Sequence, residues 1–404
     1  MAECLLNNVD NSSSKLTLLD RYEKINTAYF SSPNDQILAS APFANLLDVG
    51  IKTLNQQVFE SLRFASELGH KKAIVIGAIP FDTSKNSSLR LSTQFDCETI
   101  FKNEKRSPLG DKTEFKYDIK AVPSSHEFME SVDNALYRFS QNELDKVVLS
   151  RTLEINSNEP IDVSRVLKRL KTVNPSGYTF AVPANQYQDK NNEKTLVGAS
   201  PELLIKKVGN KIIANPLAGS EAKQDSLADD KRITEQLMNS KKDRYEHELV
   251  IKSIVQALKP LCKTLTVPKQ PSIIGTQTMW HLSTTIEGEL KSSDTSSLEV
   301  ALAMHPTPAI GGYPTESALK AIDKLESYDR NLFTGMVGWS DSTGDGEWVV
   351  TIRCAEIDNH KATLYAGAGI VEGSIPKKEL AETGAKFNTM LNALGLDIKG
   401  QDIE

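Results

Sequence analysis

The sequence predicts an α+β fold built on antiparallel sheet. Strand-like segments occur in runs and are followed by helical segments, a pattern that favours α+β over alternating β and α units. Links rich in Gly, Asn and Asp, such as STGDG and DNHK, join the strands as hairpins require. With 404 residues, 39% of them hydrophobic and 25% charged, the chain can bury a large core.

The N-terminal part mixes helix and strand. Residues 1–15 are polar and predict a flexible leader. Val58–Leu68 carries apolar residues at helical spacing and predicts a helix, whereas Lys72–Pro80 is a short β-branched run and predicts a buried strand. Residues 102–113 are charged and turn-forming, so we expect a loop between this part and the rest.

Clearer strands follow from about residue 120. The expected strands are Asp145–Ile155, Tyr178–Pro183 and Thr195–Ala199, with the polar stretch NQYQDKNNEK as a hairpin loop between the last two. A helical block is expected over roughly Leu227–Leu258.

The C-terminal part predicts a strand at Ile286–Glu289, a helix at Ser296–Met304 and then a meander. Its strands are GMVGWSD, WVVTIRCAEI and ATLYAGAGIV. A last helix is expected over Lys377–Leu394, and residues 397–404 form a tail.

Composition excludes several classes of protein. The formal net charge of -6 argues against a nucleic-acid partner, because such proteins need a basic footprint. No apolar stretch reaches the roughly 18 residues of a spanning helix, and the N-terminus lacks a signal-peptide pattern. We therefore expect a cytoplasmic protein that contacts no membrane. The four cysteines are far apart and favour reduced thiols.

Two motifs carry candidate proton-transfer groups. Lys146 begins the apolar segment in DKVVLSR, where a lysine commonly guards a strand edge. A lysine at a strand tip can also act as a general base if its pKa is lowered. Glu202 follows a Ser-Pro corner in GASPELL, as either a plain turn carboxylate or a general acid kept protonated by an apolar site.

Two helical motifs carry candidate metal ligands. Glu246 lies on the apolar stripe of KKDRYEHELVIKSIVQAL, and a buried carboxylate needs a cation or a metal. Position 251 is Ile, so the zinc-protease pattern H-E-x-x-H is absent. Glu379, Glu382 and Lys386 share one face of the last helix, either as a solvated salt-bridging face or as part of a magnesium site.

Three further segments supply anion-binding groups. Glycines in PLAGS and GAGIV let backbone N–H groups approach an anion, and Arg353 in TIRC can grip a carboxylate. GAGIV is not G-x-G-x-x-G and opens no helix, which argues against a dinucleotide site. HPTPAIGG predicts only a loop.

Together and in this order, these motifs resemble the chorismate-utilising enzymes, and most closely the isochorismate synthases of catecholate siderophore pathways of the enterobactin type. The resemblance covers roughly residues 120–396, and GAIPFD (77–82) extends it into the N-terminal part. It implies one large α+β unit with two antiparallel sheets sandwiched between helices. Residues 16–118 would form the N-terminal part of that fold, and residues 119–396 the chorismate-binding catalytic region.

The resemblance also implies roles for single residues. Lys146 matches the base that activates water, and Glu202 matches the acid that protonates the departing hydroxyl. Glu246 and Glu382 match two ligands of Mg²⁺. The positions that match substrate contacts are Gly219, Ser220, His281, Ala309, Arg353, Gly367 and Lys386. The roles of Glu248 and Glu379 around the metal stay open.

The expected reaction is the isomerisation of chorismate to isochorismate. The resemblance implies that enzymes using ammonia lack a lysine at position 146, so Lys146 indicates water as the nucleophile. Salicylate synthases share that lysine, but Ala309-Ile310 resembles the isochorismate synthase form. The alternatives are a salicylate synthase, a menaquinone-pathway isochorismate synthase and a non-catalytic chorismate-binding protein. The family resemblance implies a monomer, with other siderophore-pathway enzymes as the expected partners.

Overall fold

The structure is a computed structural model that describes residues 16–41, 43–46, 51–100, 116–184, 193–224 and 226–396. The expected leader, the 102–113 loop, most of the NQYQDKNNEK loop and the tail lie outside the described residues.

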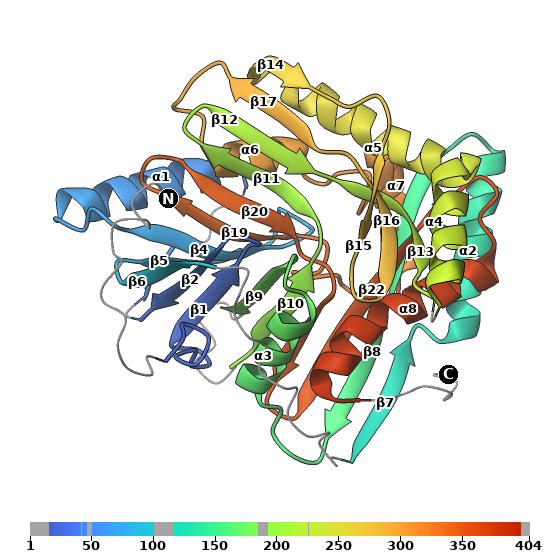
Figure 1. Cartoon of the computed structure of the whole chain (residues 1–404), viewed down its shortest axis with the longest axis horizontal. Coiled ribbons are helices and arrows are strands. Elements are labelled where there is room, and N and C mark those ends of the chain that lie inside the picture. Colours follow the sequence, from blue (N-terminus) through green and yellow to red (C-terminus); the bar gives the residue numbers. More distant parts are fainter. Residues whose placement is uncertain are drawn as a thin grey trace.

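Two large antiparallel sheets form the centre of the molecule (Figure 1). The ten-stranded sheet has the order β18 (Gly312–Tyr313), β8 (Lys146–Ser157), β22 (Lys361–Val371), β21 (Cys354–Asp358), β10 (Thr195–Ser200), β9 (Tyr178–Pro183), β1 (Thr27–Ser31), β2 (Asp35–Ser40), β6 (Phe95–Thr99), with β7 (Tyr117–Val122) also paired to β8. The nine-stranded sheet has the order β14 (Cys262–Thr266), β17 (Ile286–Leu290), β12 (Lys211–Asn215), β11 (Leu203–Val208), β20 (Gly346–Val350), β19 (Met336–Asp341), β4 (Ile74–Ile79), β5 (Ser88–Ser92), β3 (Phe43–Asn45).

A third, smaller sheet joins β13 (Leu217–Ala222), β16 (Met279–Ser283) and β15 (Ser272–Gly275). The predicted α+β fold with two antiparallel sheets is therefore confirmed, and the three-stranded sheet is an addition to it. Strands from residues 16–118 belong to both large sheets, and β7 crosses the expected 118/119 boundary. The N-terminal part therefore folds as one unit with the rest of the chain.

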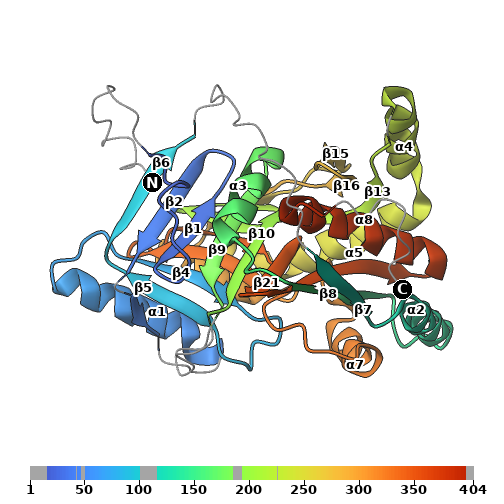
Figure 2. The ribbon, with the colours of Figure 1, turned by 90° about the horizontal axis from the view of Figure 1, so that it is seen from below.

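Helices cover the outer faces of the sheets. The helices α1 (Ile51–Glu67), α5 (Lys241–Leu258) and α6 (Ser297–Met304) pack on the nine-stranded sheet. The helices α3 (Val163–Val173), α8 (Pro376–Leu394), α2 (Ser125–Ser140) and α7 (Thr315–Leu325) pack on the ten-stranded sheet. The helix α4 (Leu227–Asn239) lies on the three-stranded sheet and projects from the body in Figure 2.

The two large sheets bury a core between them. Phe30 and Phe180 of the ten-stranded sheet pack in the same cluster as Ile76 and Trp339 of the nine-stranded sheet. These side chains alternate along their strands with others that face the helices, which is the pattern of strands buried on both faces. The predicted strand Lys72–Pro80 is β4, and all its residues are buried.

The helical block predicted over Leu227–Leu258 is two helices. The backbone of Ser240 is extended, with φ -66° and ψ 118°, and its hydroxyl accepts a hydrogen bond from the Asp243 N–H as the N-cap of α5. Ser is favoured at this position because it satisfies a free N–H of the first turn. The predicted helical block is therefore present with the expected bounds, and Ser240 divides it into α4 and α5.

Two expectations need correction. The predicted strand WVVTIRCAEI is split between β20 and β21, which lie in different sheets. Cys262 and Cys354 are free and buried, but Cys97 on the edge strand β6 is disulfide-bonded, so the prediction of reduced thiols is wrong there. Sequence spacing cannot exclude a pairing that the fold brings together.

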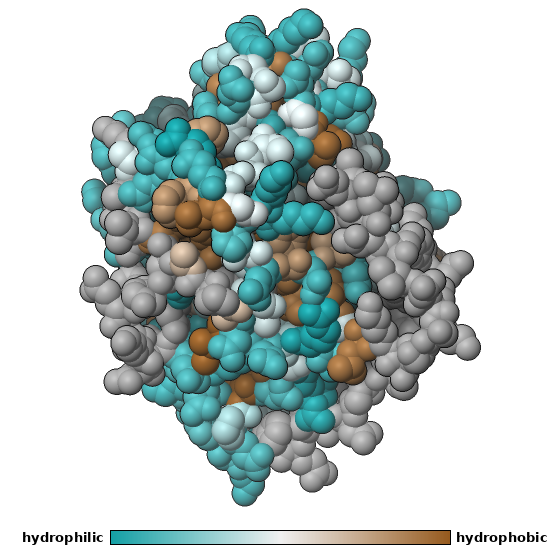
Figure 3. Space-filling model, turned by 90° about the vertical axis from the view of Figure 1, so that its left-hand side faces the viewer, coloured by the Kyte–Doolittle hydropathy of each residue, from teal (hydrophilic) through white to brown (hydrophobic). Residues whose placement is uncertain are grey.

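No helix within the described ranges has the length and apolar character to cross a bilayer. The face on the α1 side, shown in Figure 3, carries separate apolar patches among hydrophilic residues. Phe59 and Phe64 of α1 and Leu68 directly after it are exposed apolar side chains.

Candidate active site

A cleft of about 650 Å³ is lined by predicted site residues from the ten-stranded and three-stranded sheets, from α5 and α8, and from the connections between strands. Every one of them except Lys146 lines it: Glu202, Gly219, Ser220, Glu246, His281, Ala309, Arg353, Gly367, Glu382 and Lys386. Lys146 is fully buried and contacts Glu246, which is part of the lining. Residues more than 200 positions apart in the sequence therefore meet in one place.

Glu202 and Arg353 lie where the chain passes from one large sheet to the other. Glu202 separates β10 from β11, and Arg353 separates β20 from β21. The two crossings are held side by side, because the Val350 N–H donates to the Glu202 carbonyl and the Ala199 N–H donates to the Arg353 carbonyl. Arg353 has φ +51°, a left-handed conformation that a straight strand does not allow.

Glu202 has the properties of a protonated acid. Burial raises its pKa to about 7, although the Leu217 N–H and the charge of Lys146 act in the opposite direction. The Leu217 N–H donates to Oε1 at 3.3 Å. A carboxyl group that is neutral near pH 7 can donate its proton into the cleft.

Arg353 and His281 form a contact in the cleft. The Arg353 Nη2 lies 3.3 Å from the His281 Nε2, and both side chains are buried. Burial and the Arg353 charge hold the pKa of His281 well below its usual range, so the ring is neutral and its Nε2 accepts from the guanidinium. Burial also lowers the pKa of Arg353 to about 10, which leaves it charged at neutral pH.

Lys146 is ion-paired with Glu246. Its Nζ lies 2.9 Å from Glu246 Oε1, but the geometry is not that of a hydrogen bond to any described residue. Gly369 makes room for this pair, since a Cβ there would lie 2.1 Å from Glu246 Oε1. Gly369 of GAGIV therefore creates space for a carboxylate side chain.

Glu382 is held by neighbours on both sides. The Ser220 hydroxyl donates to its Oε1 at 2.8 Å, and Lys386 Nζ donates to the same oxygen at 2.5 Å. Although burial opposes its charge, Lys386 holds the pKa of Glu382 below its usual range. Lys386 also donates to the Gly367 carbonyl at 2.8 Å, which ties α8 to β22.

Further carboxylates surround Glu246 and Glu382. Burial and the neighbouring Glu382 raise the pKa of Glu379 to about 7, and burial and Glu246 raise the pKa of Asp243. Glu379 is buried on α8, whereas Glu248 points to solvent from α5. This excess of negative charge suits a cation.

The donor set fits magnesium better than a softer metal. Glu246 and Glu382 supply carboxylate oxygens to the same cleft from two helices, and magnesium usually takes one or two protein carboxylates. Within the described ranges no three His, Cys, Asp or Glu side chains form a complete ligand cage. The remaining positions of the ion would therefore belong to water or substrate.

His247 is a buried residue that contacts the cleft lining at Ala218, and the sequence carries no signal for this role. Burial lowers the pKa of its ring to about 4. The neutral ring donates from Nδ1 to the Ala218 carbonyl at 3.2 Å and accepts at Nε2 from the Thr284 hydroxyl at 2.8 Å. It fixes the chain before Gly219, whose φ of +79° and close approach to Asp243 leave no space for a side chain.

A buried Arg330–Glu326 pair behind the cleft was also missed. The Arg330 guanidinium donates from Nε to Glu326 Oε2 at 2.7 Å and from Nη2 to Oε1 at 2.5 Å. It also donates to the carbonyls of Ile310 and Val148, both at 2.8 Å, and these residues line the cleft. The only sequence signal is the i, i+4 spacing of the two charges, which is common on exposed surfaces.

We expect Glu326→Ala to destabilise the protein by about 3–5 kcal/mol, because it leaves the Arg330 charge buried without its partner. Unfolding in urea, followed by circular dichroism, measures the effect. Glu316→Ala is the matched control: Glu316 and Lys320 have the same i, i+4 spacing but are exposed, so its loss should stay below about 0.5 kcal/mol. Equal losses in the two variants would contradict this role.

The fold and the cleft define a chorismate-binding enzyme, and the family model described as "Chorismate binding enzyme" matches residues 54–395. The chain belongs to this family. Among its relatives, isochorismate synthase DhbC of Bacillus subtilis (strain 168) is 44% identical over 349 residues, covering 86% of this chain and 87% of the relative. Isochorismate synthase EntC of Escherichia coli (strain K12) is 38% identical over 381 residues, covering 92% and 95%.

A solved structure agrees with these relatives. The crystal structure of DhbC from Bacillus anthracis, assigned as a 2,3-dihydroxybenzoate-specific isochorismate synthase, superposes with a TM-score of 0.89 at 44% identity. It covers 94% of this chain, and 99% of its own length is matched. The expected family is therefore confirmed over nearly the whole chain.

Proposed function

We propose that this protein is an isochorismate synthase that supplies isochorismate for a 2,3-dihydroxybenzoate siderophore. The observation that carries the proposal is a buried carboxyl group, Glu202, whose pKa burial raises to about 7, in a cleft whose lining residue Glu246 contacts a buried lysine, Lys146. The relatives with large coverage are isochorismate synthases, which supports this reaction within the family.

The proposed reaction exchanges one hydroxyl group for another across the ring diene. Water attacks C2 of chorismate and loses a proton to Lys146 in its neutral amine form, while the C1=C2 and C5=C6 double bonds shift to C1=C6 and C4=C5. The C4–O bond breaks, and the hydroxyl leaves as water with the proton of Glu202. One water enters and one leaves, so the product is an isomer of the substrate.

Each step needs a group that the cleft supplies. Water is a poor nucleophile and hydroxide a poor leaving group, so a base and an acid each contribute about 10²–10⁴-fold. Glu202 lines the cleft and Lys146 contacts Glu246 of the same lining, which supports a role for both groups on one bound ring. Both are shielded from bulk water, which strengthens their electrostatic effects.

The cleft also provides positive charge for a dicarboxylate. Arg353 is buried and charged, and Lys386 reaches the cleft from α8. A guanidinium can hold a carboxylate through two parallel hydrogen bonds. These two groups explain how a protein with a net charge of -6 can bind a dianion.

Magnesium is part of this proposal. Glu246 and Glu382 would hold the ion, with Glu379 and Asp243 close by. A bound magnesium ion would neutralise and orient a substrate carboxylate. The ion pairs of Lys146 with Glu246 and of Lys386 with Glu382 keep the two ligands placed within the cleft.

The cytoplasmic location stays a prediction from the sequence composition, and the monomeric state and contacts with other siderophore-pathway enzymes stay predictions of the family resemblance. A salicylate synthase and a menaquinone-pathway isochorismate synthase are the alternatives within the family. A non-catalytic chorismate-binding protein is less consistent with a cleft that contains a carboxyl group of raised pKa and is lined by the ion-pair partner of a buried lysine.

The test is to incubate the purified protein with chorismate and MgCl₂ and to separate the products by HPLC. We expect isochorismate as the main product and none without magnesium. Salicylate and pyruvate as main products would indicate a salicylate synthase. Added ammonium salts should yield no aminated product, because Lys146 serves water as the nucleophile. An unchanged chorismate peak would overturn the proposed activity.

A further inference from the structure

Lys242 on α5 forms an ion pair with α8 that the proposed reaction does not use. Its Nζ donates to Glu379 Oε1 at 2.7 Å. The Glu379 side chain is only 1% exposed and that of Lys242 is 30% exposed, so the pair lies at the edge of the protein interior. Lys242 thus joins the two helices that carry Glu246 and Glu382.

The positive charge of Lys242 acts on the carboxylates at and beside the proposed metal ligands. It lowers the pKa values of Glu379, Glu382, Asp243 and Glu221, against their burial. In turn, although burial opposes its charge, Glu379 and its neighbours raise the pKa of Lys242 above its usual range.

Each of the other two lysines near the proposed metal site is paired with one of the two proposed metal ligands. Lys146 contacts Glu246, and Lys386 contacts Glu382. Lys242 instead contacts Glu379, which no other described lysine or arginine contacts in an ion pair. It is therefore free of both proposed ligands and can stay in place when they bind an ion.

We propose that Lys242 is the resident counter-ion of the magnesium site, which holds the carboxylates of α5 and α8 together before the ion binds. Like charges gathered in a buried place repel one another, and an uncompensated buried charge is strongly destabilising. A fixed cation next to Glu379 limits this repulsion. The same cation also lowers the affinity for magnesium, because it competes for the negative potential that attracts the ion. This inference rests on the proposed metal site.

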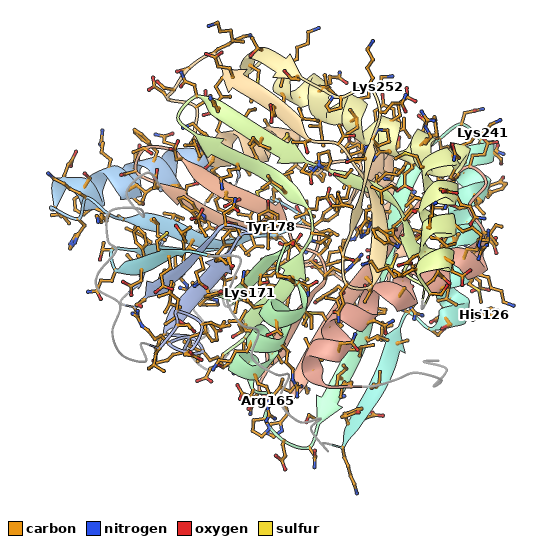
Figure 4. All side chains as sticks on the ribbon, in the orientation of Figure 1. His126, Arg165, Lys171, Tyr178, Lys241 and Lys252 are labelled. Carbon is orange, nitrogen blue, oxygen red and sulfur yellow. The ribbon has the colours of Figure 1, made fainter. Side chains whose placement is uncertain are left out.

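The test compares Lys242→Met with the wild type and with Lys241→Met. Lys241 is the adjacent residue, is exposed and points outward on α5 (Figure 4), so its replacement removes a charge without touching Glu379. Thermal unfolding is followed in EDTA and at increasing MgCl₂, and magnesium binding is measured by calorimetry without substrate.

In EDTA we expect Lys242→Met to melt roughly 3–6 °C below the wild type. Magnesium should recover most of this loss, with an affinity about tenfold tighter than that of the wild type. Lys241→Met should behave as the wild type in both measurements. A Lys242→Met protein that folds only with magnesium and unfolds when EDTA is added would also support the proposal.

Two results would overturn the proposal. One is an unchanged melting temperature of Lys242→Met in EDTA. The other is a loss that magnesium does not recover, which would make Lys242 an ordinary structural ion pair. Lys242→Arg keeps the charge and should restore wild-type values. Failure of the wild type to convert chorismate would refute the proposed reaction but would leave these metal and stability results interpretable by themselves.

Discussion

Replacing Lys146 by Met is expected to lower kcat by about 10²–10⁴-fold, because the attacking water loses the group that takes its proton. Met keeps the length of the side chain, so the buried position at the start of β8 stays filled. Steady-state kinetics with chorismate, followed as isochorismate formation, measures the effect.

The same substitution leaves Glu246 without its ion pair, so a loss of folding must be separated from a loss of chemistry. Magnesium in the assay supplies Glu246 with another cation, and circular dichroism shows whether the fold is kept. Lys120→Met is the control: Lys120 is an exposed lysine on β7, which pairs with β8. If folded Lys146→Met turns over within tenfold of the wild type, Lys146 is not the base.

Glu202→Gln is expected to lower kcat by a similar factor of about 10²–10⁴, because an amide fills the same space but has no proton to give to the leaving hydroxyl. In the wild type, kcat/KM should fall as the pH rises above about 7, where Glu202 ionises. That alkaline limb should be absent from the residual activity of Glu202→Gln. A pH profile of both proteins measures this difference.

Whereas Glu202→Gln should lower activity, it should raise the stability of the fold relative to that of the wild type. The pKa of Glu202 is raised from 4.5 to about 7 in the folded state, so the unfolded chain binds fewer protons between these values and the stability of the wild type falls as the pH rises. Glu202→Gln removes this cost, so its melting temperature should exceed that of the wild type increasingly between about pH 5 and 7. A gap that narrows over this range would contradict the burial of an ionisable acid.

Glu347→Gln is the matched control for Glu202. Burial raises the pKa of Glu347 to about 6, but this residue lies on β20 outside the cleft and pairs with Lys206. We expect it to keep wild-type kcat and the alkaline limb of the pH profile. A loss of activity equal to that of Glu202→Gln would mean that buried carboxyl groups matter here only for the fold.

Local sequence patterns were sufficient to predict the helices and strands whose apolar residues follow one clear period. The β-branched run at Lys72–Pro80 is β4, and the last helix is α8, within one residue of its expected start. The ordered motifs also identified the family and, through its resemblance, the residues that line the cleft.

Contacts between segments that are distant in the sequence could be identified only from the tertiary structure. Lys146 and Glu246 appeared as members of two separate pairs in the sequence, an acid–base pair and a metal pair, yet their side chains lie 2.9 Å apart. Arg353 appeared within one strand, but the chain leaves one sheet and enters another there. Such contacts depend on which strands pair, and pairing over long sequence separations has no local signature.

The sequence by itself determined the fold class, the family and the identity of the candidate acid, base and metal ligands, because these depend on residue type and local order. Only the tertiary structure decided which charges meet. It paired Glu246 with Lys146, Glu382 with Lys386 and Glu379 with Lys242. The physical reason is that a charge acquires its shifted pKa from burial and from neighbours across the fold, and neither is present in the residue's own segment.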